Sequence, residues 1–217
     1  MTVHHKATFD NISPEKRERI MRVATNEFAT NGFEDTSIEC IAKKAKISVG
    51  SVYKYFENKE DLFITVVHDG ISKLDELLNE LYAAREDVIV KVERILREII
   101  ALSRREPDLI KLYCVLASSK SSPLLTSVAQ EMEAMSAKIY TQAIQGAQEI
   151  GDVRTDIDPA FFAFLLDNIF MSLQFSYACD YYKDRYAIYG GEGIFDRDEF
   201  VIEQLLKFIK AAFNFKQ

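Results

Sequence analysis

Apolar residues recur every three or four positions along almost the whole chain, and this spacing constrains the fold more than any other feature. Such a period places the apolar side chains on one face of an α-helix. The 217 residues include only eight glycines and four prolines, which leaves room for long helices. No segment alternates apolar and polar residues as a half-buried strand does. The sequence therefore predicts an all-α protein with about nine helices.

The charge is distributed unevenly. The chain is 48% hydrophobic and 28% charged, which is enough for a folded core, and its formal net charge is −7. That charge taken alone argues against a surface for nucleic acid. However, residues 1–61 contain ten basic and ten acidic side chains, so residues 62–217 carry the whole negative excess. The N-terminal part is therefore not excluded as a nucleic-acid-binding region.

Targeting and membrane signals are weak in this sequence. Its three cysteines are far apart and form no C-x-x-C pair, as expected of reduced thiols in a cytoplasmic protein. The first ten residues have no apolar core of a signal peptide. The most apolar stretch, 160–175, is interrupted by Asp167 and Asn168, so we expect no membrane span.

Three helix starts lie close together in the N-terminal quarter. Thr36 opens a T-x-x-E capping box with Glu39, Ser48 precedes a second short helix, and Asn58 begins a longer one. An earlier helix is expected over 13–32. Two short helices joined by a tight turn are typical of a helix-turn-helix.

The second short helix, 48–56, has two chemically different faces. Val52 and Phe56 are four residues apart and are expected to point inward. The residues expected to point outward are Ser48, Val49, Gly50, Ser51, Tyr53, Lys54 and Tyr55. Small residues allow close approach to base edges, and hydroxyls and Lys can donate to phosphates or bases. With five lysines and one glutamate, segment 43–59 has a net charge of +4, which favours DNA binding.

The string F-x-x-x-G-F-x-x-T-S-x-x-x-I-A-x-x-A-x-I-S-x-G-S-V-Y-x-Y-F-x-N-K-E-x-L, from Phe28 to Leu62, resembles the TetR (tetracycline-repressor) family of bacterial transcription factors. The resemblance covers roughly residues 14–68. It implies a dimeric repressor with a helix-turn-helix DNA-binding domain at 1–57 and a helical ligand-binding and dimerisation domain at 58–217. The implied partners are a double-stranded DNA operator, a second copy of the chain, and a small apolar or amphipathic effector, without a membrane.

The resemblance also implies individual DNA contacts. By position, Tyr53, Tyr55 and Lys59 would contact phosphates, and Thr36 would cap a helix and could also reach a phosphate. The full expected set is Thr36, Lys46, Ser48, Val49, Gly50, Ser51, Tyr53, Lys54, Tyr55 and Lys59. Lys46 stands where the family usually has glycine, which predicts either a strained left-handed turn or a different turn geometry. Glu39 replaces an arginine that reads a base in some members.

The C-terminal half is expected to form the dimer interface and a ligand pocket. A helix over 160–182, followed by a polar flexible stretch, is apolar nearly all round and must be buried on most sides. The expected interface on this helix and on the last one, 196–213, is Phe162, Leu166, Ile169, Leu173, Val201, Leu205, Phe208, Ile209 and Ala212. The expected pocket residues are Tyr113, Cys114, Met132, Met135, Phe170, Gln174 and Tyr177, although core packing explains each equally well.

Two alternatives stay open. A DNA-binding regulator could answer to a protein partner instead of a small ligand, and its mark would be a core without a pocket. An all-α enzyme is the remote alternative. The three histidines, His4, His5 and His68, supply neither a zinc site nor the Glu-x-x-His pairs of a di-iron bundle. Phosphate-loop, dinucleotide and hydrolase motifs are missing, so we expect no catalytic residue, metal or cofactor.

Overall fold

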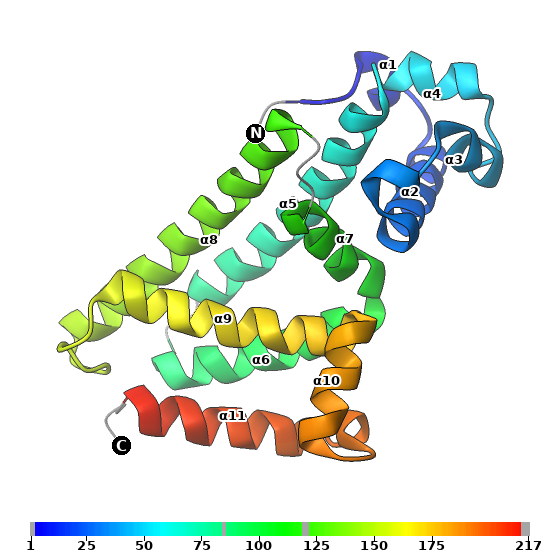
Figure 1. The fold of residues 1–217 in the computed structure, drawn as a ribbon. Coiled ribbons are helices and arrows are strands. Elements are labelled where there is room, and N and C mark those ends of the chain that lie inside the picture. Colours follow the sequence, from blue (N-terminus) through cyan, green and yellow to red (C-terminus); the bar gives the residue numbers. More distant parts are fainter. Residues whose placement is uncertain (1–2, 84–85, 119–121, 214–217) are drawn as a thin grey trace. The chain divides into compact units, whose positions relative to one another are not determined.

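The computed structural model describes residues 3–83, 86–118 and 122–213, with the side chains of 73–83, 118, 212 and 213 outside the described part. Within these ranges the chain forms eleven α-helices and a short 3-10 helix, Ile194–Asp196, and no strand (Figure 1). The predicted all-α class is confirmed. The two additional helices are α1 (Ala7–Asp10) and α10 (Asp180–Gly190).

Both additional helices escaped prediction because neither has an apolar period. α1 has four residues and α10 has no buried side chain. The apolar helix expected to reach residue 182 ends earlier, since α9 spans Pro159–Ala178 and Cys179 takes an extended conformation with φ −101° and ψ 129°. The segment after it, expected to be flexible, is helical as far as Gly190.

The chain divides into two compact units. Unit 1 comprises Met1–Asp75 and Asp108–Glu131, and unit 2 comprises Glu76–Pro107 and Met132–Gln217. The expected functional boundary after residue 57 is a different kind of division and stays a prediction. The helices α5 (Lys59–Ala83) and α8 (Pro123–Glu149) have residues in both units.

Unit 1 contains the helices that were predicted from local signals. α2 (Pro14–Asp35) begins at the N-cap Ser13, α3 spans Ile38–Lys44 and α4 spans Val49–Tyr55. α7 (Pro107–Ser118) also belongs largely to this unit. The expected break at Gly32 is present as a kink with φ 76° inside α2, a conformation that favours glycine. The buried core of α2 to α5 includes Ile20, Ala24, Phe28, Ile41, Val52, Phe56, Leu62 and Phe63.

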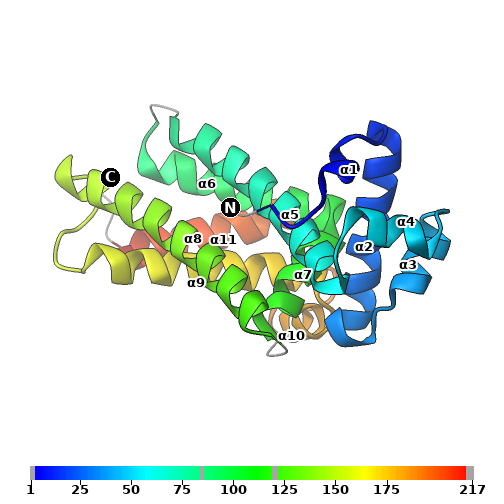
Figure 2. The ribbon, with the colours of Figure 1, turned by 90° about the horizontal axis from the view of Figure 1, so that it is seen from above.

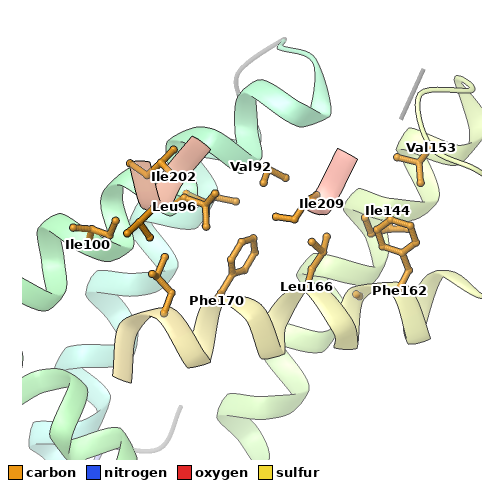
Figure 3. Close-up of a cluster of buried hydrophobic side chains, with 14 of the residues drawn as sticks. Val92, Leu96, Ile100, Ile144, Val153, Phe162, Leu166, Phe170, Ile202 and Ile209 are labelled. Atoms are coloured by element: carbon orange, nitrogen blue, oxygen red, sulfur yellow. The ribbon is translucent and has the colours of Figure 1, made fainter. Parts of the chain in front are cut away.

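Unit 2 has its own apolar core between α6 (Val88–Arg105), α8, α9 and α11 (Asp198–Phe213). Figure 3 shows side chains from these helices pointing toward one another, among them Val92, Leu96, Ile144, Phe162, Leu166, Phe170, Ile202 and Ile209. At the surface, the Arg97 guanidinium pairs with Glu199 at 2.5 Å and with Glu93 at 2.8 Å. The pair with Glu199 joins α6 to α11, the pair with Glu93 lies within α6, and both raise the pKa of Arg97.

Among the described helices, α9 alone is long and apolar enough to cross a membrane by length and composition. The same properties are expected of a core helix, and nine of its residues are buried within unit 2. α9 packs against α6 and α10, so its apolar character is explained by burial within the protein.

Candidate nucleic-acid interface

α3, the turn after it and α4 form the predicted helix-turn-helix. The side chain of Ser37 caps α3 by accepting a hydrogen bond from the Cys40 backbone N–H at 3.1 Å. The Ser48 hydroxyl caps α4 by accepting one from the Ser51 backbone N–H at 3.0 Å. These caps satisfy donors that a helix start leaves free, so each short helix begins at a defined residue.

Thr36 has a different role from the predicted one. It is buried, and its hydroxyl donates to the backbone carbonyls of Glu27 and Gly32 at 3.0 and 2.7 Å. The prediction that Thr36 caps α3 is wrong, because Ser37 does so. A buried hydroxyl that already donates inside the protein does not reach a DNA phosphate. The expected contact between Thr36 and DNA is therefore also wrong.

The turn between α3 and α4 keeps a left-handed residue although that residue is a lysine. Lys46 has φ 56°. The Ile47 N–H donates to the Ala42 carbonyl at 3.0 Å, and the Lys46 N–H donates to the Lys43 carbonyl at 3.2 Å. This is the Schellman pattern, which normally places glycine at the left-handed position. Of the two possibilities left open by the sequence, the structure has the strained one, and the Lys46 side chain is exposed.

The inward face of α4 is larger than predicted. Val52 and Phe56 are each 1% exposed, as expected. Tyr55 was expected outward but is 4% exposed; its ring lies 5.7 Å from that of Phe9, and its hydroxyl accepts a hydrogen bond from Lys16 Nζ at 2.9 Å. Tyr55 follows Val52 by three residues and therefore shares its face. The outward prediction for Tyr55 is wrong.

The outward face of α4 retains small, aromatic and basic residues. Ser48, Gly50, Tyr53 and Lys54 are exposed, whereas Val49 and Ser51 are half-buried. Tyr53 is 46% exposed, which is high for an aromatic side chain on a seven-residue helix with a buried opposite face. These side chains present hydrogen-bonding groups and one positive charge to whatever approaches α4.

Gly50 is not required by the protein's own packing. A Cβ atom added there would lie 3.9 Å from Ser48 Oγ, an ordinary contact, and the residue is helical. Glycine weakens a helix by about 1 kcal/mol relative to alanine. A glycine at this position leaves the backbone of α4 open to close approach by another molecule.

Two lysines of the basic segment 43–59 are engaged within the protein. Lys44 forms an ion pair with the buried carboxylate of Glu27. That carboxylate also accepts a hydrogen bond from Cys40 Sγ at 3.0 Å, and these two contacts lower the pKa of Glu27. Lys59 Nζ donates to the backbone carbonyls of Phe33, Glu34 and Thr36 at 2.8, 2.9 and 3.1 Å.

These contacts correct the prediction for Lys59, whose ammonium group already has three acceptors at the end of α2. Lys43, Lys46 and Lys54 are exposed, and none has an ion pair with another described residue. The unpaired positive charge of the helix-turn-helix is therefore carried by these three lysines, one on α3, one in the turn and one on α4.

Part of the expected dimer interface in unit 2 lies on the inward faces of its helices. Five of its residues are buried inside the chain itself, namely Phe162, Leu166, Leu173, Val201 and Ile209. Ile169 and Leu205 are half-buried and Phe208 is 59% exposed, while the side chain of Ala212 lies outside the described residues. The exposed aromatics of α9 are Phe161 and Phe164, at 57% and 59%. An apolar period that runs all round a helix does not specify which side faces the core.

The expected pocket residues do not form one site within a single unit. Tyr113 and Cys114 belong to unit 1, and the other five belong to unit 2. Unit 2 contains a cavity of about 460 Å³ between α6, α8 and α9. Its apolar wall includes Val92, Ile95, Ile144, Ala147, Leu166 and Phe170, and its polar lining is Glu86, Lys91, Tyr140, Gln142 and Asp152. Of the expected residues, Phe170 is the one in this lining.

Tyr177 lies outside the lining of this cavity and packs against α6 and α11. Its hydroxyl donates to Asp198 Oδ1 at 2.8 Å, and the Arg104 guanidinium lies 5.0 Å from the centre of its ring. Arg104 also pairs with Asp198 at 2.7 Å. Burial and the bond to Asp198 raise the pKa of Tyr177. This cluster links α6, α9 and the start of α11.

The structure also places residues 4–10 against α4, an arrangement that the sequence did not predict. Lys6 and Thr8 donate hydrogen bonds to backbone carbonyls of α4, and Phe9 is buried beside Phe56. The one available signal was an isolated aromatic residue, Phe9, in an otherwise polar segment.

Comparison with known proteins agrees with this geometry. Residues 20–66 match the family described as "Bacterial regulatory proteins, tetR family". The HTH-type transcriptional regulator YdgC of Bacillus subtilis is 30% identical over 148 residues, which cover 66% of this chain and 71% of that protein.

Solved structures share the fold over nearly the whole chain. A TetR family regulator from Chloroflexus aurantiacus has a TM-score of 0.69 and 23% identity, with 96% and 97% of the two chains covered. FadR from Bacillus subtilis, solved with stearoyl-CoA, has a TM-score of 0.69 and 18% identity, with 87% and 97% covered. This chain therefore belongs to the tetR family of bacterial regulatory proteins and is a transcriptional regulator with a helix-turn-helix DNA-binding region.

Proposed function

We propose that this regulator represses transcription by binding a near-palindromic operator as a dimer, and that a small, largely apolar effector releases it. The observation that carries the proposal is the outward face of α4. Gly50 leaves its backbone open, Tyr53 and Lys54 are exposed beside it, and Lys43 and Lys46 add unpaired charge. A recognition helix presents such residues to base edges and phosphates in the major groove.

Two copies of α4 would enter successive major grooves about 34 Å apart. Ser48, Val49, Gly50, Ser51 and Lys54 are the proposed contacts to bases, and Tyr53 and Lys46 the proposed contacts to phosphates. Since phosphate contacts release counterions, operator affinity should fall steeply as salt is raised. Catalysis plays no part in this function.

The operator can be obtained by selecting duplexes from a random-sequence pool with the wild-type protein. Tyr53→Ala combined with Lys54→Ala should raise the Kd for the selected duplex about a hundredfold, because both contacts lie on the recognition face. Tyr181→Ala with Lys183→Ala is the matched control, since it removes the same residue types from α10. Fluorescence anisotropy gives both values. An unchanged Kd in the first variant, with its helical circular dichroism intact, would refute the assignment.

The cavity of unit 2 supports a small effector over a protein partner, because a regulator controlled by a protein partner is expected to have a core without a pocket. Its wall is apolar and its polar lining contains two carboxylates, Glu86 and Asp152, and one ammonium group, Lys91. FadR binds stearoyl-CoA, which makes an acyl compound the first class to test. The mixed charge of the lining favours an uncharged head group over the phosphates of coenzyme A.

Gly146 provides a direct test of the cavity. It lies in the lining, and a Cβ added there meets nothing within 4 Å, so a side chain can be introduced at this position to narrow the cavity. Palmitoyl-CoA and hexadecanol are titrated into the protein–duplex complex while anisotropy is followed. Gly146→Leu should abolish release and keep the Kd for DNA, whereas Gln145→Leu, next to it and outside the lining, should behave as wild type. If neither compound releases DNA, the protein-partner alternative gains support.

The proposed dimer uses the exposed aromatic residues of α9 and α11. Phe161, Phe164 and Phe208 are each more than half exposed, although large apolar side chains are normally covered in a stable protein. A twofold interface would cover the same patch on both copies. Phe161→Glu with Phe164→Glu should therefore yield monomers in sedimentation velocity, and a persistent dimer would exclude this face.

A further inference from the structure

Residues 4–10, which we call the N-terminal strap, lie against the C-terminal end of α4. Figures 1 and 2 both place α1, which forms part of the strap, beside α4, and the two helices are in contact. The strap, α2, α4 and the start of α5 all belong to unit 1. Nothing in the helix-turn-helix pattern itself requires a segment at this place.

The strap supplies hydrogen-bond donors to the last three carbonyl groups of α4. Lys6 Nζ donates to the Tyr53 carbonyl at 3.0 Å, and Thr8 Oγ1 donates to the Lys54 carbonyl at 2.5 Å. The Lys6 backbone N–H donates to the Tyr55 carbonyl at 2.7 Å. A helix leaves its last carbonyls without intrahelical donors, and here a segment distant in sequence satisfies three in a row.

The strap is anchored on both sides of these bonds. Phe9 is 2% exposed, and its ring centre lies 4.8 Å from that of Phe56. Arg17 Nη2 on α2 donates to the Phe9 and Asp10 carbonyls at 3.2 and 2.8 Å, which holds the end of α1. The strap is therefore part of the folded unit.

The first residues of the strap are held by α5. His4 Nδ1 lies 3.2 Å from Asp61 Oδ1, and the His4 and His68 rings meet edge to face at 5.6 Å. Lys6 also pairs with Glu57 at 2.7 Å. This ion pair neutralises an exposed carboxylate two residues after the end of α4, which would otherwise repel DNA phosphates.

A seven-residue helix is too short to hold its own shape and direction in water, so its neighbours must set both. We propose that the N-terminal strap is a positioning element for DNA binding, which holds the C-terminal end of α4 so that Tyr53 and Lys54 face the operator. The proposal rests on the DNA-binding function proposed above. Lys6 and Thr8 act through α4, because their donors reach the carbonyls of the residues proposed to touch DNA.

Thr8→Val tests the proposal with the least disturbance, because valine keeps the shape of threonine and removes the hydroxyl donor. The Kd for the selected duplex should rise about tenfold. Amide hydrogen exchange should become faster over residues 49–57, and the salt dependence of binding should stay unchanged because the substitution removes no charged group. Thr8→Ser keeps the donor and should restore the wild-type Kd.

Thr25→Val is the matched control, since the Thr25 hydroxyl donates to the Met21 carbonyl at 2.9 Å within α2, away from the strap. All variants are compared at a temperature where circular dichroism shows them fully folded, so a loss of stability alone leaves the Kd unchanged. A wild-type Kd for Thr8→Val, an equal loss for Thr25→Val, or no recovery with Thr8→Ser would overturn the proposal. Failure of the wild-type protein to enrich any duplex would instead overturn the proposed function, and the strap's role with it.

Discussion

α4 and α9 show how differently two helices of one chain reveal their orientation. At α4, Val52 and the C-cap residue Phe56 were expected to point inward among small and polar residues, and both are buried, although Tyr55 joins them. In α9, apolar residues lie all round the helix axis. Three α9 residues expected to contact a partner subunit, Phe162, Leu166 and Leu173, are buried inside the chain itself. Contrast between faces, and not total hydrophobicity, allows a helix to be oriented from sequence.

The largest expected effect separates the two faces of α9. Phe162→Ala should lower the free energy of unfolding by about 3–5 kcal/mol, because the side chain is fully buried in the core of unit 2. Phe161→Ala, one residue earlier and 57% exposed, removes the same side chain and should cost the monomer far less. Urea unfolding at a concentration where the protein is monomeric compares them. Equal losses would mean that the faces are assigned wrongly.

The next effect concerns the outward face of α4. Gly50→Ala should leave the protein as stable as wild type or more stable, by up to about 1 kcal/mol, since a Cβ there meets only an ordinary contact. The same methyl group should weaken operator binding about tenfold by keeping the backbone away from the DNA. Thermal unfolding and anisotropy on the selected duplex measure the two quantities. If stability and affinity fall together, the fold itself needs Gly50. The outward face of α4 would then be part of the protein's own packing, and α4 would not differ from α9 as described.

The next effect is a change of about 1 kcal/mol in the free energy of unfolding, caused by titration of Asp167 on α9. Burial, and to a lesser degree the Glu133 carboxylate, raise the pKa of Asp167 to about 6. The folded protein then binds more protons than the unfolded chain between about pH 4 and pH 6, so stability falls as pH rises through that range. Asp167→Asn should remove this dependence and stabilise the protein by about 1 kcal/mol at pH 7, a value reduced for partial access of water.

Urea midpoints of wild type and Asp167→Asn at pH 4 and pH 7 check the sign. The two proteins should differ at pH 7 and converge at pH 4, where the wild-type carboxyl is protonated in the folded state. A wild-type protein that becomes more stable between pH 4 and pH 6 because of Asp167 would contradict the expected direction.

The smallest effect belongs to the turn before α4. Lys46→Gly should relieve the left-handed strain and stabilise the protein by roughly 1 kcal/mol or less, because glycine also loses more chain entropy on folding. It should weaken DNA binding only severalfold, and by a similar factor for every duplex sequence, as expected of a phosphate contact. A change in the selected base sequence would instead make Lys46 a base-reading residue.

The helix-turn-helix could be predicted almost completely because its signals are local. Serine caps, a three- to four-residue period and a tight turn determine α3 and α4 through bonds between residues close in sequence. Even there, an error arose at the N-cap of α3, where the adjacent residues Thr36 and Ser37 were both candidates and Ser37 is the cap. Both are good caps by chemistry, and burial of the Thr36 hydroxyl made the choice.

The sequence by itself determined the helical class, the position of the recognition helix and the family, because each depends on spacing within a few turns of chain. Tertiary structure alone decided that Tyr55 turns inward, that Lys44 and Lys59 are engaged, which face of α9 is buried, and that residues 4–10 hold the end of α4. These outcomes depend on groups far apart in sequence. A free carbonyl, a buried carboxylate or an apolar face acquires its partner only when the helices have packed.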